Sequence, residues 1–321
     1  MSFSGEVKEE LVKQIGAARH CQIAEIAAIT SLCGHLKKRE NQAVILEIHT
    51  ENESVLRKYF TLLKKTFKIK TEIVEKQSPY LHKKNIYMIQ IEKQEDIQNI
   101  FQAAKLQNIV QNGVMDISQT SNMIVQHSCC KRAFIRGAFL AAGSISDPAK
   151  SYHFEIVCPT MEKAEQLRDI ISSFELDAKI VIRKKYFVVY LKEGAQIVEI
   201  LGVMEANVAL LNLENVRILK DMRNSLNRQV NCEAANINKT VSAAVKQIED
   251  IKYIRDTIGF SELSKGLEDM AKLRLEYSDV PLKELGKMLS PPVGKSGVNH
   301  RLRKLSSIAE ELRGKQGGRL L

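Results

Sequence analysis

The sequence predicts an α+β fold: a pseudo-symmetric two-repeat domain with the element order α-β-β-α-β-β-α, followed by an all-α helix-turn-helix domain. Three observations support this. Residues 26–34 (IAAITSLCG) and 135–143 (IRGAFLAAG) are two short apolar helices of small residues, and each ends in glycine. The same succession of strand and helix patterns follows each of them. From residue 261 onward the periodicity is helical only, and a proline-rich turn interrupts it.

The composition limits the class of protein. A chain of 321 residues can hold two or three domains, and a net charge of +10 favours a polyanionic partner. Aromatic residues make up 6% and tryptophan is absent, which argues against base-stacking platforms for single strands. No stretch approaches the ~20 apolar residues of a membrane span, and the N-terminus lacks a signal-peptide pattern. We therefore expect a cytoplasmic protein without a membrane segment.

Six cysteines occur without any CxxC pair, which favours reduced thiols over a disulfide framework. Cys21, Cys33 and His35 are close in sequence, but their spacing fits no standard zinc site. We therefore predict buried thiols and no metal site. The sequence contains no glycine-rich phosphate loop, so we also predict no cofactor.

We assign residues 1–19 to an N-terminal helix and residues 20–205 to the two-repeat domain, with repeats at about 20–110 and 129–205. In the first repeat we expect helices at 20–34, 52–67 and 96–106, strands at 43–49, 69–74 and 86–91, and a hairpin turn near Glu40 and Asn41. In the second we expect helices at 130–142, 160–174 and 195–204, a turn at 143–150, and strands at 152–157, 179–183 and 186–191. Asn52 and Thr160 are the expected N-caps.

Residues 206–260 are predicted to connect the two domains. The run 223–240 (RNSLNRQVNCEAANINKT) is polar and has no steady period, which indicates a linker. A long helix should follow at 238–258, with an apolar stripe from Val241 to Ile254. Four cations, Arg217, Lys220, Arg223 and Arg228, either form a face that contacts phosphates or are solvated charges, and the sequence does not decide between these readings.

Residues 261–321 have the pattern of a helix-turn-helix domain. A first helix is followed by a second at 281–289 (PLKELGKML), with Pro281 at a favourable first position. The turn SPPVG cannot continue a helix, because it contains two prolines. Gly286 is small, as a close helix crossing requires.

The third helix, which begins at Lys295, has the features of a DNA-reading helix. Val298, Leu302 and Leu305 repeat at helical spacing and should attach it to the module. Its remaining faces carry the candidate DNA-binding residues Lys295, Ser296, Asn299, His300, Arg301, Arg303 and Lys304. Asparagine suits adenine and arginine suits guanine through paired hydrogen bonds, whereas Lys295 and Ser296 suit phosphate. The alternative is a solvated amphipathic helix.

The two glycine-ended helices resemble the LAGLIDADG helices of homing endonucleases, which pack together at a pseudo-two-fold axis. In that family the residue before the final glycine is an acid that binds the divalent metal for DNA cleavage. Cys33 and Ala142 occupy these positions here. Alanine cannot bind Mg²⁺ and a thiol is a poor ligand for a hard cation, so we predict no catalytic residues.

The whole chain resembles the WhiA family of bacterial regulators. The most specific stretches are NRQVNCEAANINKTVSAA (227–244) and PLKELGKMLSPPVGKSGVNHRLRKL (281–305). This resemblance implies a non-catalytic DNA-binding transcription regulator of Gram-positive bacteria. It also implies a link to cell division and chromosome segregation, and to sporulation in some lineages.

The leading hypothesis is therefore a sequence-specific binder of double-stranded DNA, nucleoid-associated and monomeric, with other regulatory proteins as further partners. One alternative is a metal-dependent DNA endonuclease, which would need acids near the ends of both central helices. Another is a protein-interaction scaffold, whose helix-turn-helix domain would bind protein instead of DNA. The exposed cations of the third helix favour the DNA-binding hypothesis.

Overall fold

The computed structural model describes residues 2–38, 44–77, 85–111 and 114–317. The chain forms two compact units, Met1–Asp221 and Met222–Leu321. Within the described residues, none of the helices combines the length and apolar character that a membrane crossing requires. The predicted hairpin turn at Glu40 and Asn41 lies outside these residues.

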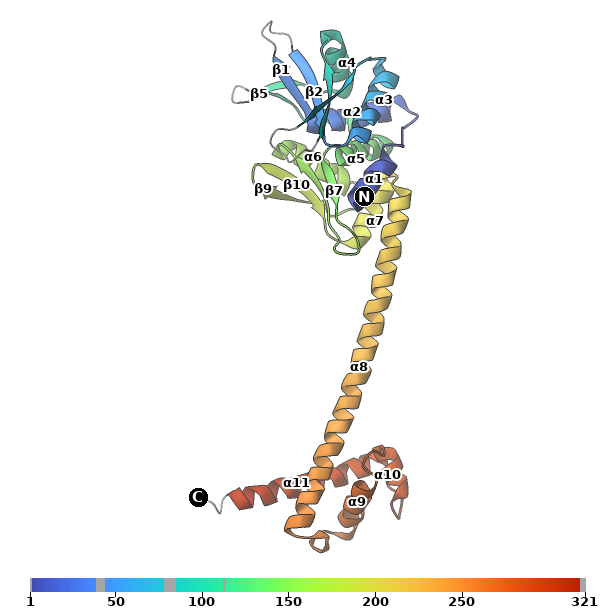
Figure 1. The fold of residues 1–321 in the computed structure, drawn as a ribbon, viewed down its shortest axis with the longest axis vertical. Helices are drawn as coiled ribbons and strands as arrows, with labels where there is room; N and C mark the ends of the chain where they lie inside the picture. The colour runs from blue at the N-terminus through green and yellow to red at the C-terminus, as the bar shows by residue number, and fades with distance from the viewer. Residues whose placement is uncertain (1, 39–43, 78–84, 112–113, 318–321) are drawn as a thin grey trace. The chain divides into compact units, whose positions relative to one another are not determined.

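In the first unit, two repeats have the same element order, as predicted (Figure 1). The first contains α2 (Arg19–Cys33), β1 (Gly34–Lys38), β2 (Val44–Thr50), α3 (Glu53–Phe67), β3 (Ile73–Gln77), β4 (Asn85–Ile91) and α4 (Gln94–Ala104). The second contains α5 (Ser128–Ala142), β7 (Gly143–Ile145), β8 (Phe154–Cys158), α6 (Met161–Ser172), β9 (Lys179–Arg183), β10 (Tyr186–Leu191) and α7 (Gly194–Met204). Each repeat forms a four-stranded antiparallel sheet, in the order β1-β2-β4-β3 or β7-β8-β10-β9. Helix α1 (Phe3–Leu11) precedes the repeats.

Helices α2 and α5 are equivalent along their whole length. Each has 15 residues, and the glycine after each begins the next strand. A Cβ atom built on Gly34 would lie 2.3 Å from the carbonyl oxygen of Thr30, and one on Gly143 would lie 2.3 Å from the Phe139 ring. Both positions therefore require glycine because the chain turns back closely against the last helical turn.

The predicted caps are confirmed. The backbone N–H of Val55 donates to Asn52 Oδ1 at 3.2 Å, and that of Lys163 donates to Thr160 Oγ1 at 3.4 Å. Two local expectations differ from the structure, and the segment between the repeats, for which no element was predicted, contains some. The turn predicted after the second central helix begins with β7, the strand predicted at 69–74 lies at 73–77, and the segment joining the repeats contains the hairpin β5 (Asn108–Gln111) and β6 (Val114–Ile117) and the 3-10 turn η1 (Asn122–Val125).

The predicted linker between the domains is wrong. Residues 207–257 form one helix, α8 (Asn207–Thr257), of 51 residues. The segment contains no glycine or proline, so nothing in it ends a helix. Its first N–H groups, those of Val208 and Ala209, donate to the Glu10 carboxylate at 2.8 and 2.9 Å. Residues 223–240 are exposed throughout. Because this part of the helix buries no face, its sequence has no amphipathic period from which a helix could be predicted.

The two central helices cross at Gly137 of α5. A Cβ atom at this position would lie 2.7 Å from the Glu25 carbonyl oxygen and 3.0 Å from the Ala28 Cβ atom. Ala24 and Ala138 are buried in the same contact. Any larger residue at Gly137 would separate the helix backbones, so small residues set the distance between the repeats.

A cluster of buried charges lies beside this crossing. The Glu25 carboxylate forms ion pairs with Lys58 of α3 and with Arg136 of α5, whose Nε atom lies 3.3 Å away. Arg136 also donates to Glu205 at 2.7 Å, and Lys58 donates to the Leu11 carbonyl oxygen at 2.8 Å. Burial lowers the pKa of Lys58, and the negative charge of Glu25 opposes this shift. The Glu25 carboxylate therefore connects α2 with α3 and α5, and Lys58 extends the cluster to α1.

Each sheet also places a glutamate on the face away from its helices. Glu47 and Glu155 are equivalent, since each precedes the isoleucine that pairs with the glycine at the start of its sheet. Glu47 contacts Lys37 at 2.6 Å and His49 at 3.0 Å, and Glu155 contacts Arg183 at 2.8 Å. Burial would raise the pKa of Glu47, but hydrogen bonds from Lys37 and Gln90 outweigh it and lower this pKa to about 2.

The second unit packs the end of α8 against α9 (Lys265–Glu276), α10 (Leu282–Met288) and α11 (Lys295–Gly317). The 3-10 turn η2 (Phe260–Glu262) precedes α9. The core contains Val298, Leu302 and Leu305 of α11, as predicted, together with Met270, Ala271, Leu285 and Ala309. Of the predicted α8 stripe, Ile251 and Ile254 are buried, whereas Val241 and Val245 are exposed. A Cβ atom on Gly286 would lie 2.0 Å from the Val293 carbonyl oxygen, and this glycine therefore permits the tight turn between α10 and α11.

Replacing Glu25 with glutamine should destabilise the first unit by about 3–5 kcal/mol, because the buried Lys58 loses its counter-charge and Arg136 keeps only Glu205. Urea unfolding of the full chain measures this loss. Glu53→Gln is the matched control: it removes an exposed ion pair with Arg57 on α3 and should cost at most about 1 kcal/mol. Equal effects of the two substitutions would contradict the importance of the buried cluster.

The Glu47 carboxyl should contribute to acid sensitivity. Its pKa is lower in the folded state than the unfolded value of about 4.3, so its stabilisation is present at neutral pH and is lost as pH falls from about 5 toward 2. At pH 7 the free energy of unfolding of Glu47→Gln should be lower than that of the parent protein. Urea unfolding across this pH interval should show that this free energy falls less in the variant than in the parent. Parallel stability curves for the two proteins would contradict this.

Gly286→Ala should destabilise the second unit by about 1–3 kcal/mol, because the new methyl group overlaps the Val293 carbonyl oxygen. Hydrogen exchange of the α11 amides measures the effect within this unit. Gly314→Ala is the control, placed on α11 itself: no atom lies within 4 Å of the new methyl, so it should stabilise by up to about 1 kcal/mol. Slower exchange in Gly286→Ala would refute the packing argument.

Candidate nucleic-acid interface

The candidate interface is built on helix α11, which follows α10 after the turn at residues 289–294. Val298, Leu302 and Leu305 attach it to the module, and each is at most 1% exposed. The backbone N–H of Val293 donates to the Gly286 carbonyl oxygen at 2.8 Å, which closes the turn. The first turns of α11 are therefore held rigidly against α9 and α10.

Five of the seven predicted DNA-binding residues are exposed on this helix: Lys295, Ser296, His300, Arg303 and Lys304. Ser296, His300 and Arg303 follow one another at spacings of four and three residues, so they form one stripe. This stripe lies opposite the stripe that packs into the core. Together these side chains offer cationic groups and hydrogen-bond donors along one face of one helix.

The other two predicted residues, Asn299 and Arg301, are half-buried and flank the exposed stripe. Arg301 donates to the Gly266 carbonyl oxygen of α9 at 3.3 Å. Asn299 lines a cavity of about 570 Å³ between α8 and the start of α10, with Val241, Ile248 and Leu282. The structure therefore places these two residues against neighbouring helices, which the sequence did not indicate.

Among the described residues, three exposed cations in the first turns of α11 have no acidic partner. Lys295, Arg303 and Lys304 form none of the ion pairs that the structure contains. By contrast, Lys37 and Arg183 on the two sheets are paired with Glu47 and Glu155. The charge of α11 is therefore free to interact with an anion.

Two polar residues that position the module were missed by sequence reasoning. Asp250 of α8 is 1% exposed and forms an ion pair with Arg313 of α11 at 2.7 Å. Arg274 of α9 is buried and donates to the Val280 carbonyl oxygen at 2.9 Å, which fixes the loop before α10. A sequence signal existed for both, because each is a charged residue at helical spacing from apolar positions of its own helix.

Of the four α8 cations that the sequence left open, two have partners within the first unit. Arg217 pairs with Glu214 at 3.2 Å, and Lys220 donates to the Pro148 carbonyl oxygen at 2.7 Å. Arg223 and Arg228 are exposed. The four residues therefore do not form one uniform face.

The structure places Cys33 and Ala142 where the resemblance predicts, as the last residues of α2 and α5. The Cys33 thiol donates to the Ala141 carbonyl oxygen at 3.4 Å, and burial raises its pKa to about 11, opposed by the charge of Lys8. Lys163 donates to the Ser31 carbonyl oxygen at 3.0 Å. The ammonium groups of Lys8 and Lys163 therefore lie close to this end of the helix pair, where Lys163 also contacts the Asp116 carboxylate at 3.8 Å.

Family models match three consecutive parts of the chain. Residues 19–107 match the WhiA N-terminal LAGLIDADG-like domain, and residues 131–223 match the WhiA LAGLIDADG-like domain. Residues 226–309 match the WhiA C-terminal HTH domain. The matched segments contain the first repeat through α4, the second repeat from residue 131 onward, and all of α9 and α10.

Relatives extend the similarity over nearly the whole chain. A probable cell division protein WhiA of Lachnoclostridium phytofermentans is 57% identical, over 98% of this chain and 100% of its own length. One of Clostridium botulinum is 47% identical, over 99% and 100%. The solved structure of full-length DUF199/WhiA from Thermatoga maritima is similar in fold, with a TM-score of 0.59 at 23% identity over 97% of this chain and 99% of that one. This chain therefore belongs to the WhiA family, with a degenerate LAGLIDADG-like domain and a C-terminal helix-turn-helix domain.

Proposed function

We propose that this protein is a sequence-specific binder of double-stranded DNA without nuclease activity, and that it acts as a transcription regulator. The observation that carries the proposal is the exposed face of α11, where Lys295, Arg303 and Lys304 lack acidic partners within the described residues. A helix held after a tight turn can enter the major groove and present its first turns to base edges. The helix-turn-helix domain that the family model matches supports this reading.

The residues of α11 divide into two proposed roles. Ser296, His300 and Arg303 form the exposed stripe, so they are the proposed base-reading groups. Lys295 and Lys304 lie beside this stripe and are the proposed phosphate contacts. Asn299 and Arg301 remain proposed DNA contacts, but Arg301 would first have to leave the Gly266 carbonyl oxygen, and Asn299 would have to turn out of the cavity that it lines.

The two-repeat domain has a secondary role in this proposal. Its sheet cations Lys37 and Arg183 are already neutralised by Glu47 and Glu155, which limits their attraction for phosphate. It would add weak DNA contacts or bind other regulatory proteins. The lysines near Cys33 and Ala142 support the absence of cleavage.

The relatives' name, probable cell division protein, supports a role in cell division. We propose that the regulated processes include cell division and chromosome segregation, and that the protein is a cytoplasmic, nucleoid-associated monomer of a Gram-positive bacterium. Regulation at DNA gives one mechanism for these processes, because binding at specific sites controls the genes beside them.

Selection of bound sequences from random duplex DNA, with Mg²⁺ present, tests the proposal. The full chain should enrich one motif and leave the DNA uncut. Ser296→Ala/Arg303→Ala should weaken binding to that motif by about 1–3 kcal/mol and relax the preference at one or two positions, since a paired arginine–guanine contact is lost. Titrations across a salt series measure both changes.

Lys252→Ala serves as a control for the loss of one exposed cation in the same unit, and it should retain the motif. Lys304→Ala should weaken binding equally for all sequences and reduce the salt slope by about one. The absence of any enriched motif would overturn the proposal and favour a protein-interaction scaffold. Cleavage that requires Mg²⁺ would favour the endonuclease.

A further inference from the structure

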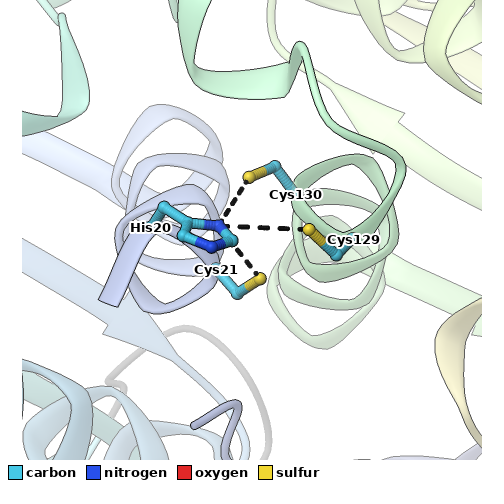
Figure 2. A group of neighbouring side chains, drawn as sticks. All are labelled: His20, Cys21, Cys129 and Cys130. Atoms are coloured by element: carbon cyan, nitrogen blue, oxygen red, sulfur yellow. Dashed lines mark hydrogen bonds between the residues drawn. The ribbon is translucent and has the colours of Figure 1, made fainter. Parts of the chain in front are cut away.

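A cluster of three cysteines and one histidine lies at the other end of the central helix pair, away from Cys33 and Ala142. Figure 2 shows His20 and Cys21 on α2 facing Cys129 and Cys130 on α5. One potential ligand atom of each residue lies within 4.8 Å of the other three. The His20 Nδ1 atom is 3.1 Å from Cys130 Sγ, 3.4 Å from Cys21 Sγ and 4.0 Å from Cys129 Sγ.

The four residues are related by the internal repeat. His20 and Cys129 are each the second residue of their helix, and Cys21 and Cys130 are each the third. Each repeat therefore contributes an equivalent pair. The sequence had grouped Cys21 with Cys33 and His35, but the fold brings Cys21 to two cysteines of the other repeat instead.

The spacing fits a tetrahedral ion. Zinc–sulfur distances of about 2.3 Å and zinc–nitrogen distances of about 2.0 Å place neighbouring ligand atoms roughly 3.5–3.8 Å apart. The distances from His20 Nδ1 to the three sulfur atoms fall on both sides of this range. Small side-chain rotations would therefore bring the four ligand atoms to tetrahedral spacing. Three sulfurs and one imidazole suit a soft or borderline ion, and they do not suit Mg²⁺ or Ca²⁺.

The surroundings also suit a bound cation. All three thiols are free, and each lies in the first turn of a helix, where unpaired backbone N–H groups stabilise thiolates. Burial and the neighbouring thiols raise the pKa of Cys21 and Cys130, a cost that a dication bound among the sulfurs would offset. Cys21 and Cys130 are buried whereas His20 and Cys129 are exposed, so an ion can enter from solvent.

We propose that His20, Cys21, Cys129 and Cys130 bind one Zn²⁺ ion in a closed structural site. The three thiols bind as thiolates and release their protons to solvent, and His20 binds as the neutral ring through Nδ1. With four protein ligands, no position stays open for a reacting water. The ion would join the first turns of α2 and α5 and thereby clamp the two repeats together.

Metal binding to the full chain under reducing conditions tests the site. After removal of metal by a chelator, the protein should take up one equivalent of Zn²⁺, measured by elemental analysis. With Co²⁺ as the probe, it should show the visible absorption of a tetrahedral cobalt–thiolate complex. Cys129→Ser should abolish this absorption, whereas Cys232→Ser, which removes an exposed cysteine on α8, should keep it.

Histidine variants separate coordination from a packing effect. His20→Ala should weaken uptake, whereas His20→Cys, which completes a set of four cysteines, should restore it and strengthen the cobalt–thiolate absorption. His127→Ala is the control, because it removes a neighbouring imidazole that is not a proposed ligand. The His127 ring centroid lies 6.1 Å from that of His20, and His127 directly precedes α5. Zn²⁺ should raise the unfolding temperature of the parent protein but leave that of Cys129→Ser unchanged.

Two results would overturn the proposal. The first is no tetrahedral cobalt absorption and less than half an equivalent of zinc in protein that circular dichroism shows to be folded. The second is a disulfide between the helices that persists in reducing buffer and blocks metal uptake. Both results leave the DNA-binding proposal untouched, since the site lies in the first unit and α11 in the second.

Discussion

The first unit depends on how closely α2 and α5 approach each other. Gly137 rests against the Glu25 backbone, and its missing side chain sets the distance between the two repeats. The neighbouring side chains of Glu25 and Arg136 are buried beside this crossing, where a charge without a partner is costly, and they pair with each other. The buried charges are thus a consequence of the crossing, and Lys58 joins the same network from α3.

Features encoded in short windows could be predicted from the sequence. Glycine after a run of small apolar residues marked both central helices, and Asn52 and Thr160 marked two helix starts. Features that depend on distant contacts could not. Helix α8 is exposed between residues 223 and 240 and carries no periodic signal there, although its lack of glycine and proline was visible. The Glu25 network joins residues from both repeats.

In the candidate interface, too, local features could be predicted from the sequence and distant contacts could not. Helical spacing identified the buried side of α11, and therefore the exposed side, because one follows from the other on an amphipathic helix. It did not show that Arg301 would reach α9 or that Asn299 would face α8. The cysteine cluster was hidden for a similar reason: its two halves are adjacent only after the repeats have packed.

The glycines that end the central helices have a consequence for how such a chain can change over generations. Gly34 and Gly143 are required by steric contact with the turn before them, whether or not any chemistry takes place there. The residues just before them, Cys33 and Ala142, carry no such requirement. A lineage could therefore exchange the acids of an endonuclease at these two positions without unfolding. Selection on stability alone would preserve the glycines, so the helix pair would stay recognisable long after its activity had gone.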